Sequence, residues 1–430
     1  MKNTVKKAIA FALALVMVLA LTACGSAKPT EPTAAPSAAP DAEPTAAPEA
    51  APTAEPAPEA KEQTASFRKT KIGVALYFDS GYYPANVRTY LGALGEAMNL
   101  EFVYTVLTQT DEAANLTKIQ ELIAAGAEGI ILTLDMGTPT ILQECASANV
   151  YVAGFLCDFN TSFNMSYDDV FKNPTFLGTA SDGPCGDDLR AGYDFFDSLM
   201  EYNERHADEP IRHIAMVTFP AWAFPVQQVF VQQFTEKIDE YNKTAETPIV
   251  LDPLNEAVDV LPFTPLDSTY FSKHEGIDAI FCFADGYTFV YPTMVSTGIN
   301  GAIKLFCAGY GESSDQNFGS KGNGTFQQET VSAIEAVIYP VVMLVNKLNG
   351  VSFPDQPAEA ERVSCFSIIV NSDEDMDAFV NHSFYITGNL DDALYSAEQV
   401  ANMTAVANPD ATYADLVSIM DQMTIEYIHK

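Results

Sequence analysis

Short apolar runs and longer amphipathic stretches alternate along the chain from residue 71 onward. Residues 71–78 are almost continuously apolar, and Asp79, Ser80 and Gly81 follow, which is typical of a buried parallel strand and its turn. Pro84 then opens a stretch whose apolar residues recur at helical spacing. The same patterns predict strands at 101–107, 129–134 and 150–156, and a helix from the N-cap Asp111 to Gly126. Strands separated by single helices imply right-handed βαβ units and a parallel sheet.

The alternation restarts at residue 212. Strands are predicted at 212–218, 277–283, 302–308 and 363–370. Helices are predicted through 226–234, at 287–297, and at 331–348 after Gln327. Two successive doubly wound parallel-sheet lobes of the α/β class are the simplest account of this order. A folded part of this length is also more than one hydrophobic core usually accommodates.

The N-terminus carries a separate signal. Lys2, Lys6 and Lys7 precede the apolar run 8–21, and Leu-Thr-Ala stands directly before Cys24. The run is short for a membrane span, and the order of basic, apolar and small residues is that of an export signal. The four residues ending at Cys24 resemble the lipobox of bacterial lipoproteins. That resemblance implies cleavage of a signal peptide at 1–23 and a diacylglyceryl and palmitate anchor on Cys24 in the cell membrane, facing outward. An ordinary secretory signal or a short membrane helix are the alternatives.

Residues 24–66 are rich in Ala, Pro, Glu and Thr in near repeats. Such a stretch holds too little apolar surface to offset the entropy of ordering it, so we expect a disordered tether that separates a folded module from the membrane.

Charge and cysteine usage limit the classes of partner that the protein can bind. The chain has 57 acidic and 22 basic residues and a formal net charge of −35, so it offers no basic patch for nucleic acid. Besides Cys24 there are six cysteines, none in a C-x-x-C pair, and the five histidines lack ligand spacing. We therefore predict buried free thiols, no metal site and no cofactor.

Four motifs in order give a resemblance to a known family. They are the helix, glycine and apolar strand at 116–132, then residues 178–182, 281–285 and 324–328. Together they resemble the type I periplasmic binding proteins, the solute-binding subunits of ABC importers, over roughly 71–379. The resemblance implies two lobes joined by a three-segment hinge, with 178–182 crossing to the second lobe and 324–328 crossing back. The implied N-terminal lobe is 67–181 plus 329–362, and the C-terminal lobe with its tail is 182–328 plus 363–430.

The resemblance also implies a role. A monomer would capture a small solute by hinge closure and deliver it to the permease subunits of an ABC importer. Delivery to a sensor kinase or chemoreceptor is the first alternative, and a surface protein without a solute site is the second. No serine-hydrolase elbow, phosphate-binding glycine loop or His-Glu-x-x-His motif is present, so we predict no catalytic residues.

Ligand-binding residues are expected in the loops after the strands, because ligands of open α/β sheets bind outside the carboxyl ends of the strands. Aromatic faces with a few oriented polar groups are typical of compact solute sites. The loop candidates are Asp79, Tyr82, Tyr83, Asp135, Asp158, Asn160, Trp222, Phe224, Asp285, Tyr287 and Tyr310. Family position adds Asp182, Gln327 and Gln328 at the hinge. Trp222, the only tryptophan, lies between two prolines on such a loop and is the foremost single candidate.

The residues at these positions also favour one class of solute. Sugar-binding members of the family usually offer an Asn-Asp pair where this chain has Ala284-Asp285, and an Asp where it has Gly309-Tyr310-Gly311. Acidic loops with almost no Lys or Arg repel an anion. We therefore expect a neutral solute, a nucleoside or a modified sugar, in preference to an ordinary pentose or hexose.

Overall fold

The computed structural model describes residues 66–160, 166–252 and 259–429. The predicted signal peptide, Cys24 and nearly all of the predicted tether lie outside the described residues. All described residues belong to one compact unit. Among them, no helix combines the length and the apolar character needed to span a membrane.

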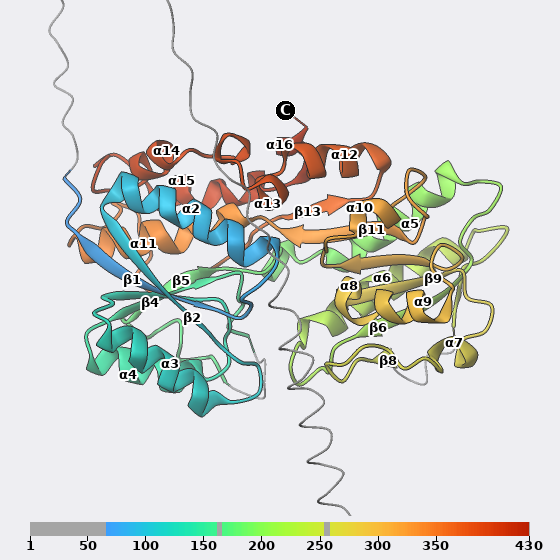
Figure 1. Ribbon diagram of the computed structural model, residues 1–430, viewed down its shortest axis with the longest axis horizontal. Coiled ribbons are helices and arrows are strands. Elements are labelled where there is room, and N and C mark those ends of the chain that lie inside the picture. Colours follow the sequence, from blue (N-terminus) through green and yellow to red (C-terminus); the bar gives the residue numbers. More distant parts are fainter. Residues whose placement is uncertain (1–65, 161–165, 253–258, 430) are drawn as a thin grey trace, which may run out of the picture. The chain divides into compact units, whose positions relative to one another are not determined.

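The first lobe is built on a six-stranded sheet, sheet A, with the strand order β12-β5-β4-β3-β1-β2 and parallel pairing throughout (Figure 1). Its elements are β1 (Thr70–Leu76), α2 (Tyr82–Met98), β2 (Leu100–Val106), α3 (Glu112–Ala124), β3 (Gly129–Leu132), α4 (Thr138–Ser147), β4 (Tyr151–Phe155), β5 (Phe176–Ala180), the 3-10 turn η3 (Ile334–Val337), α11 (Ile338–Leu348) and β12 (Arg362–Val363). The parallel strands and intervening helices confirm the predicted βαβ order. Asp111 caps α3 as predicted, since its carboxylate accepts the Ala114 N–H at 2.9 Å.

The second lobe is built on sheet B, with the order β13-β11-β10-β9-β6-β7 and β8 paired to β6. Its elements are η2 (Gly186–Asp188), α5 (Ala191–Arg205), β6 (His213–Thr218), α6 (Val226–Asn242), β7 (Val250–Leu251), β8 (Asp259–Val260), α7 (Tyr270–Lys273), β9 (Ala279–Asp285), α8 (Gly286–Phe289), α9 (Tyr291–Thr297), β10 (Lys304–Ala308), α10 (Ser314–Asn317), β11 (Phe326–Ser332) and β13 (Ser367–Val370). All pairs are parallel except β11 with β13. Two doubly wound sheets, as the sequence predicts, therefore make up the fold.

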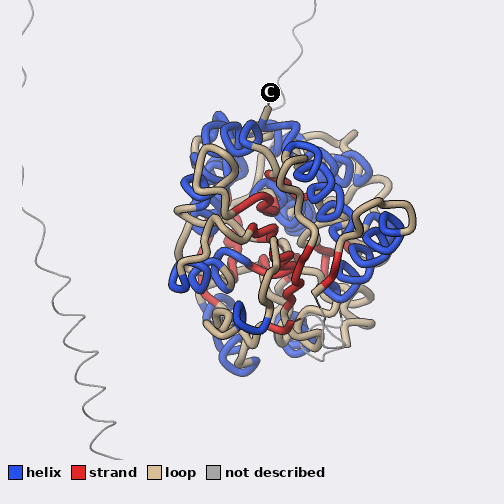
Figure 2. Tube along the Cα trace, turned by 90° about the vertical axis from the view of Figure 1, so that its right-hand side faces the viewer, coloured by secondary structure: helices blue, strands red, loops and turns tan. Residues whose placement is uncertain are grey.

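Helices cover both faces of each sheet, and the strands lie inside (Figure 2). In sheet A, Ile72 and Val74 face α2 and α11, whereas Ala75 faces α3. In sheet B, Met216 packs with α5 and α6, and Val217 faces α8 and α9. Alternate strand residues thus enter different cores, which is the behaviour expected of a sheet buried on both faces.

Three segments connect the lobes, and two of them differ from the sequence prediction. Residues 331–348 were predicted as one helix, but β11 continues to Ser332 and the helical part begins at Ile334. The prediction that 324–328 crosses between lobes is therefore wrong, because these residues precede or lie within a strand of sheet B. Residues 363–370 were predicted as one strand; they form β12 in sheet A and β13 in sheet B, with the crossing between them. The first crossing follows β5, where residues 178–182 were expected to cross.

The residues after β13 fold into a series of short helices that we call the C-terminal segment (373–429). It contains α12 (Asp373–His382), α13 (Phe384–Thr387), η4 (Leu390–Asp392), α14 (Ala397–Asn402), α15 (Tyr413–Ser418), η5 (Met420–Gln422) and α16 (Ile425–Ile428). Serine and threonine hydroxyls cap α12, α13, α14 and α15, and Ser396 with Gln399 forms a full capping box before α14. The prediction grouped this stretch with the C-terminal lobe. In the structure it contacts α2 and α11 of the first lobe and β13 of the second (Figure 1).

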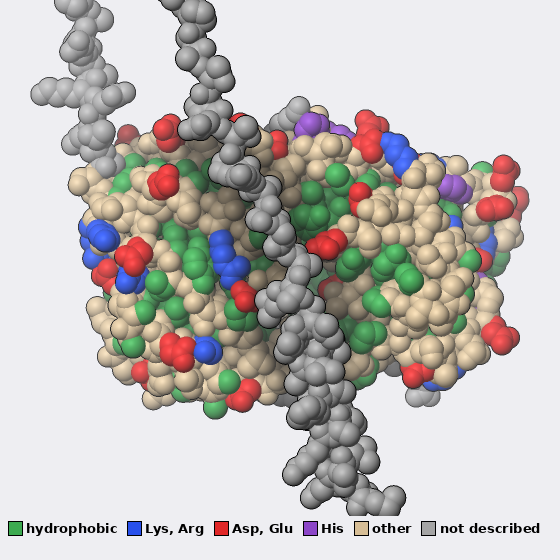
Figure 3. Space-filling view, viewed as in Figure 1, with side chains coloured by type: hydrophobic (Ala, Val, Ile, Leu, Met, Phe, Trp, Pro, Cys, Tyr) green, Lys and Arg blue, Asp and Glu red, His purple; other side chains and the backbone are tan. Residues whose placement is uncertain are grey.

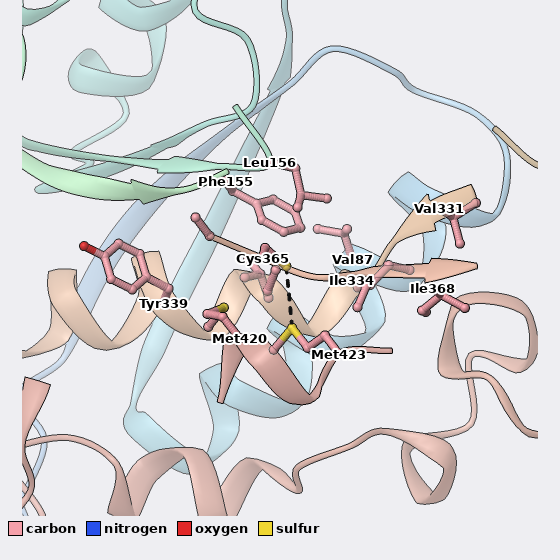
Figure 4. Packing of buried hydrophobic residues seen from close by; sticks show 14 of the residues in the cluster. Val87, Phe155, Leu156, Val331, Ile334, Tyr339, Cys365, Ile368, Met420 and Met423 are labelled. Atoms are coloured by element: carbon pink, nitrogen blue, oxygen red, sulfur yellow. Dashed lines mark hydrogen bonds between the residues drawn. The ribbon is translucent and has the colours of Figure 1, made fainter. Parts of the chain in front are cut away.

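The C-terminal segment also covers the crossings between the lobes. Met420 and Met423 pack beside Cys365, between β12 and β13, and beside Ile334, at the start of η3 (Figure 4). The Cys365 Sγ lies 3.9 Å from the Met423 Sδ, and the Phe366 N–H donates to the Met420 carbonyl at 3.3 Å. All six described cysteines are free, and five of them, all except Cys185, are buried, as predicted.

Candidate functional site

Residues from both sheets and from the C-terminal segment meet where the strands of the two lobes end. We call this group the interlobe site; its members are Tyr77, Tyr82, Tyr83, Asp158, Asp182, Asp285, Tyr310, Glu329 and Tyr385. Figure 1 shows the two sheets whose carboxyl ends lead into it. Direct ring contact joins the lobes, because the rings of Tyr82 and Tyr310 have centroids 6.1 Å apart. The strand ends have therefore come together as the fold rule for open α/β sheets predicts.

Asp158 and Asp182 form a polar link across the first crossing. The Asp182 N–H donates to the Asp158 Oδ1 at 3.1 Å, and the Ser332 hydroxyl donates to the Asp182 Oδ1 at 2.6 Å. Arg362 donates to the carbonyl of Asp158 at 2.5 Å and to that of Phe159 at 2.9 Å. Asp182 thus connects the tip of β4 to the end of β11, so its carboxylate lies at the hinge where family position predicted it.

The acids of the interlobe site are biased toward their protonated forms. Desolvation and the charge of Asp182 raise the pKa of Asp158 to about 7. Desolvation by the surrounding protein also raises the pKa of Asp182, Asp285 and Glu329, although hydrogen bonds from Ser332, Thr288 and Ser314 oppose it. Burial away from water is the main cause of these shifts, and neighbouring carboxylates add to it only at Asp158 and Glu329. The site can therefore both donate and accept hydrogen bonds near neutral pH, and it disfavours an anionic ligand.

One tyrosine hydroxyl of the site is buried without a partner among the described residues. The Tyr83 hydroxyl is buried and makes no hydrogen bond within the described part of the chain. The phenols of Tyr77, Tyr83 and Tyr385 lie close enough to Asp182 that its charge raises the pKa of each. The rings are held by stacking, Tyr83 on Phe155 at 5.9 Å and against Tyr77 at 6.0 Å. Buried polar groups are ordinarily paired, so hydroxyls held in this way are available to a ligand or to water.

Glu329 is a buried member of the site that the sequence reasoning did not predict. Its side chain is 1% exposed, and its Oε1 accepts the Ser314 hydroxyl at 2.5 Å. Its Oε2 has no partner among the described residues. Its charge raises the pKa of Tyr310 and Tyr385, so the carboxyl lies within electrostatic range of both phenols.

A second aromatic group lies at the tip of β6. Phe219, Phe224 and Trp222 surround Phe263, with centroids 5.0, 6.3 and 5.9 Å from its ring. Phe224 and Phe263 pack against apolar clusters of both lobes, so this group also lies between the lobes. Trp222 is 48% exposed and presents a large apolar surface there.

The remaining predicted residues have different surroundings. Asp79 is exposed and pairs with Arg88 at 2.7 Å, and Asp135 is buried near Asp158, whose pKa its charge raises. Asn160 is half-buried beside the undescribed residues 161–165. The Tyr287 ring packs with Tyr291 and Phe326, and its hydroxyl lies 3.2 Å from that of Ser313.

Gln327 and Gln328 do not lie at a crossing. Both side chains are buried within β11, where Gln327 donates to the Gly324 carbonyl and Gln328 to the Thr330 hydroxyl, each at 2.9 Å. The expectation that they stand at the hinge is wrong because β11 runs on to Ser332. The interlobe residues missing from the prediction are Tyr77, Glu329 and Tyr385. The position of Tyr77 at the end of the first apolar run was a usable signal, whereas Tyr385 lies beyond the family-like span.

A hollow elsewhere on the first lobe is a less suitable site. It has a volume of about 340 Å³ and is lined by residues including Arg68, Glu128, Tyr151 and Lys347, which lie at the amino ends of sheet A strands and on α11. Arg68 and Glu128 already pair with each other at 2.8 Å. Within the described ranges, no group of three or more His, Cys, Asp and Glu residues is arranged to hold a metal ion.

Comparison with known proteins bears on the fold. No protein-family model and no curated protein matches the sequence. Among solved structures, a carbohydrate transporter solute-binding protein from Agrobacterium radiobacter in complex with D-arabinose is 15% identical with a TM-score of 0.52, covering 74% of this chain and 100% of that one. An ABC transporter periplasmic solute-binding protein from Actinobacillus succinogenes with bound D-allose is 12% identical with a TM-score of 0.53, covering 72% and 99%.

A sugar ABC transport substrate-binding protein from Bordetella parapertussis is similar over 71% of this chain and 90% of its own, with 12% identity and a TM-score of 0.51. The two sheets, the three crossings and these likenesses together agree with the resemblance seen in the sequence. The described part of the chain has the two-lobed α/β fold of the type I periplasmic binding proteins.

Proposed function

We propose that this protein is a membrane-anchored, extracytoplasmic solute-binding protein that captures a small neutral solute, sugar-like or nucleoside-like, and delivers it to an ABC importer. The observation that carries the proposal is the interlobe site. The Tyr83 hydroxyl, which has no partner among the described residues, lies with Tyr77 and Tyr385 among carboxyls with raised pKa at the carboxyl ends of both sheets. A ligand with hydroxyl groups or ring nitrogens supplies the partners that these side chains lack.

The electrostatics of the site support a neutral ligand. Asp158, whose pKa is raised to about 7, donates a hydrogen bond when protonated and accepts one when ionised, so a solute that both donates and accepts is matched. An anion would meet several carboxylates at once. On the face shown in Figure 3, Lys and Arg side chains are few and scattered among Asp and Glu, which does not favour nucleic acid as a partner.

Capture follows from the two-lobed architecture. Tyr83 and Asp158 belong to the first lobe and Asp285, Tyr310 and Glu329 to the second, so one ligand reaches both sets only when the lobes are together. A ligand that prefers the closed arrangement shifts the population toward it by the difference in affinity. We propose that importer subunits recognise this closed form and that Cys24 carries the lipid anchor at the cell membrane. The protein would act as a monomer and would not be an enzyme.

Titration calorimetry of the purified full-length protein tests this function. We choose D-allose, D-arabinose, myo-inositol, adenosine and inosine as neutral probes, and phosphate and succinate as anionic controls. We expect at least one neutral probe to bind and neither anion to do so. Binding of phosphate or succinate at submicromolar concentration, or of no neutral probe, would contradict the proposal. A sensing role would give the same binding without solute uptake by cells that carry the gene, which uptake of the radiolabelled probe distinguishes.

A further inference from the structure

The C-terminal segment is held on the first lobe by buried polar contacts. Asn86 of α2 donates to the carbonyls of Phe384 at 3.3 Å and Tyr385 at 2.8 Å. On the same helix, the Tyr90 hydroxyl donates to the Tyr395 carbonyl at 2.7 Å, and its ring lies 5.4 Å from that of Phe384. Asn86 and Tyr90 are buried, so α13 has a fixed place on α2.

The same segment is held on the second lobe. Asp373 at the start of α12 accepts the Ser320 N–H at 3.1 Å and its hydroxyl, and Asp377 pairs with Lys321. Helix α12 also packs on β13, from which it emerges. The solute-binding protein from A. radiobacter is covered in full while only 74% of this chain is matched. The unmatched part of this chain therefore exceeds the N-terminal residues 1–65 and includes described residues.

Between these two attachments the segment carries Tyr385 into the interlobe site. Its ring lies 6.4 Å from that of Tyr310 and 5.7 Å from that of Phe379, so its orientation is fixed from the second lobe's side. Its backbone is fixed from the first lobe by Asn86. Its phenol lies near enough to Asp285, Glu329 and Asp182 to interact with the charge of each.

The Tyr385 side chain itself is not used for packing alone. It is half-buried, whereas its neighbour Phe384 is fully buried against Tyr90. The hydrogen bonds of Tyr385 to described residues are made by its backbone, with Ser383 and Asn86, and none by its hydroxyl. A tyrosine is costly to leave unpaired in such surroundings unless water or a ligand completes its hydrogen bonds.

We infer that the C-terminal segment forms a third wall of the solute site and that Tyr385 is a solute-contacting residue which helps determine specificity. This inference rests on the proposed function. The phenol hydroxyl would bond to a hydroxyl or ring nitrogen of the solute, and Asp285 and Glu329 would bond to neighbouring polar groups of the same solute. With the lobes together, as in the structure, Asn86 holds the Tyr385 backbone and Tyr310 contacts its ring, so the hydroxyl has a defined position.

The experiment compares Tyr385→Phe with a matched control, Tyr395→Phe. The first change removes only the hydroxyl and keeps the ring that packs on Tyr310. The second removes a hydroxyl of the same segment that donates to Gln422 at 3.0 Å; neither residue belongs to the interlobe site. Calorimetry uses the full-length protein and the same probes, D-allose, D-arabinose, myo-inositol, adenosine and inosine. Circular dichroism melting curves check that both variants fold.

We expect Tyr385→Phe to raise the Kd of the probe that wild type binds most tightly by about fivefold to tenfold, which corresponds to the loss of one hydrogen bond. The Kd of Tyr395→Phe should stay within twofold of the wild-type value. The ranking of probes should also change for Tyr385→Phe alone. Wild-type binding with an unchanged Kd and ranking in Tyr385→Phe would overturn the inference and leave the proposed function standing. Absence of binding by wild type to every neutral probe would overturn the proposed function, and the inference with it.

Discussion

Replacing Glu335 by glutamine tests whether a buried carboxyl beneath the C-terminal segment makes stability depend on pH. Glu335 lies in η3 of the first lobe and is completely buried. Its Oε1 accepts the Leu394 N–H at 3.3 Å and the Tyr427 hydroxyl at 3.2 Å, both from the C-terminal segment. Its Oε2 has no partner among the described residues. Desolvation raises the pKa of this carboxyl, and the hydrogen bonds only partly oppose that.

The sign and size of the effect follow from linkage. The folded state holds the Glu335 proton more tightly than the unfolded chain, in which the carboxyl has a pKa of about 4.3. The stabilisation is therefore complete below that pKa and is lost as pH rises toward the raised folded-state pKa. Across this window the free energy of unfolding falls by up to about 1.4 kcal/mol per pH unit from this group alone. Glutamine does not titrate, so E335Q lacks this slope.

Glutamine is a close match in other respects. Its carbonyl keeps the acceptor that Leu394 and Tyr427 use, and its NH2 occupies the place of Oε2. The protonated wild-type carboxyl has an unmatched O–H at the same place, so both proteins carry a similar cost of about 1–3 kcal/mol there. We expect similar stability near pH 4.5 and a growing advantage for E335Q at higher pH.

Urea unfolding followed by circular dichroism at pH 5, 6, 7 and 8 measures this difference, with intrinsic fluorescence as a second probe of two-state behaviour. Glu426→Gln is the matched control, because Glu426 is an exposed carboxyl on α16 of the same segment. Its pH dependence should follow that of wild type. Parallel curves for wild type and E335Q from pH 5 to 8 would refute the reasoning, since Glu335 would then ionise alike in both states.

Three further predictions concern single residues. Trp222→Ala should weaken binding of the best neutral probe severalfold in calorimetry. The melting temperature should stay nearly unchanged, because the Trp222 side chain is 48% exposed. Equal affinity of the variant and wild type would show that Trp222 does not contact the solute. Gly178→Ala should lower the free energy of unfolding in urea by about 2–3 kcal/mol, because φ is +104° and a Cβ would lie 2.3 Å from the Tyr339 hydroxyl. Gly350→Ala, which also has a positive φ but open space around it, should lower it by about 1 kcal/mol. Asp158→Asn should flatten the fall in melting temperature between pH 5 and 8, since the wild-type pKa of about 7 makes stability decline as pH rises to that value; an unchanged fall would contradict this.

The fold was predictable wherever an apolar run coincides with a strand that ends in turn residues. Residues 71–78 and 129–134 are such runs, and both contain central strands of sheet A. The prediction failed at 326–332, whose sequence Phe-Gln-Gln-Glu-Thr-Val-Ser looks too polar for a strand. In the structure this is an interior strand between β10 and β13, and its Gln and Glu side chains are buried. Periodicity cannot reveal a strand whose buried face is polar, nor the short break between β12 and β13.

The candidate site was predictable only as far as strand ends fix it. The carboxyl-end rule identified Tyr82, Asp158 and Asp285, which the structure brings together with Asp182. No local pattern connects Tyr385 to them, because its neighbours Asn86 and Tyr310 are distant in sequence. Glu329 was missed for the opposite reason, since acidic residues are abundant throughout the chain and nothing local marks one as buried.

The course of the C-terminal segment restricts how the two lobes can move. After α12 on the second lobe, α13 and α14 pack on α2, and Asp355 of the first lobe accepts the N–H groups of Tyr413 at 2.7 Å and Ala414 at 3.0 Å. The chain then returns through η5, beside Cys365, to α16, where His429 pairs with Asp375 of α12 at 2.8 Å. The segment thus adds an outward and a return connection to the three crossings.

The return connection lies along the crossings and the outward connection lies next to the interlobe site, so the proposed closure would affect them differently. The return passes along the crossings themselves, where a hinge rotation displaces atoms least, so the Met420 and Met423 contacts can persist (Figure 4). The outward connection runs from α12 to α13 at Ser383, next to the interlobe site. Since buried contacts hold α13 on α2, whereas α12 continues β13, the proposed rotation of the lobes would be absorbed near Ser383. In the proposed closure, Tyr385 would move with the first lobe toward Asp285 and Tyr310, and its contact with solute would form at that stage.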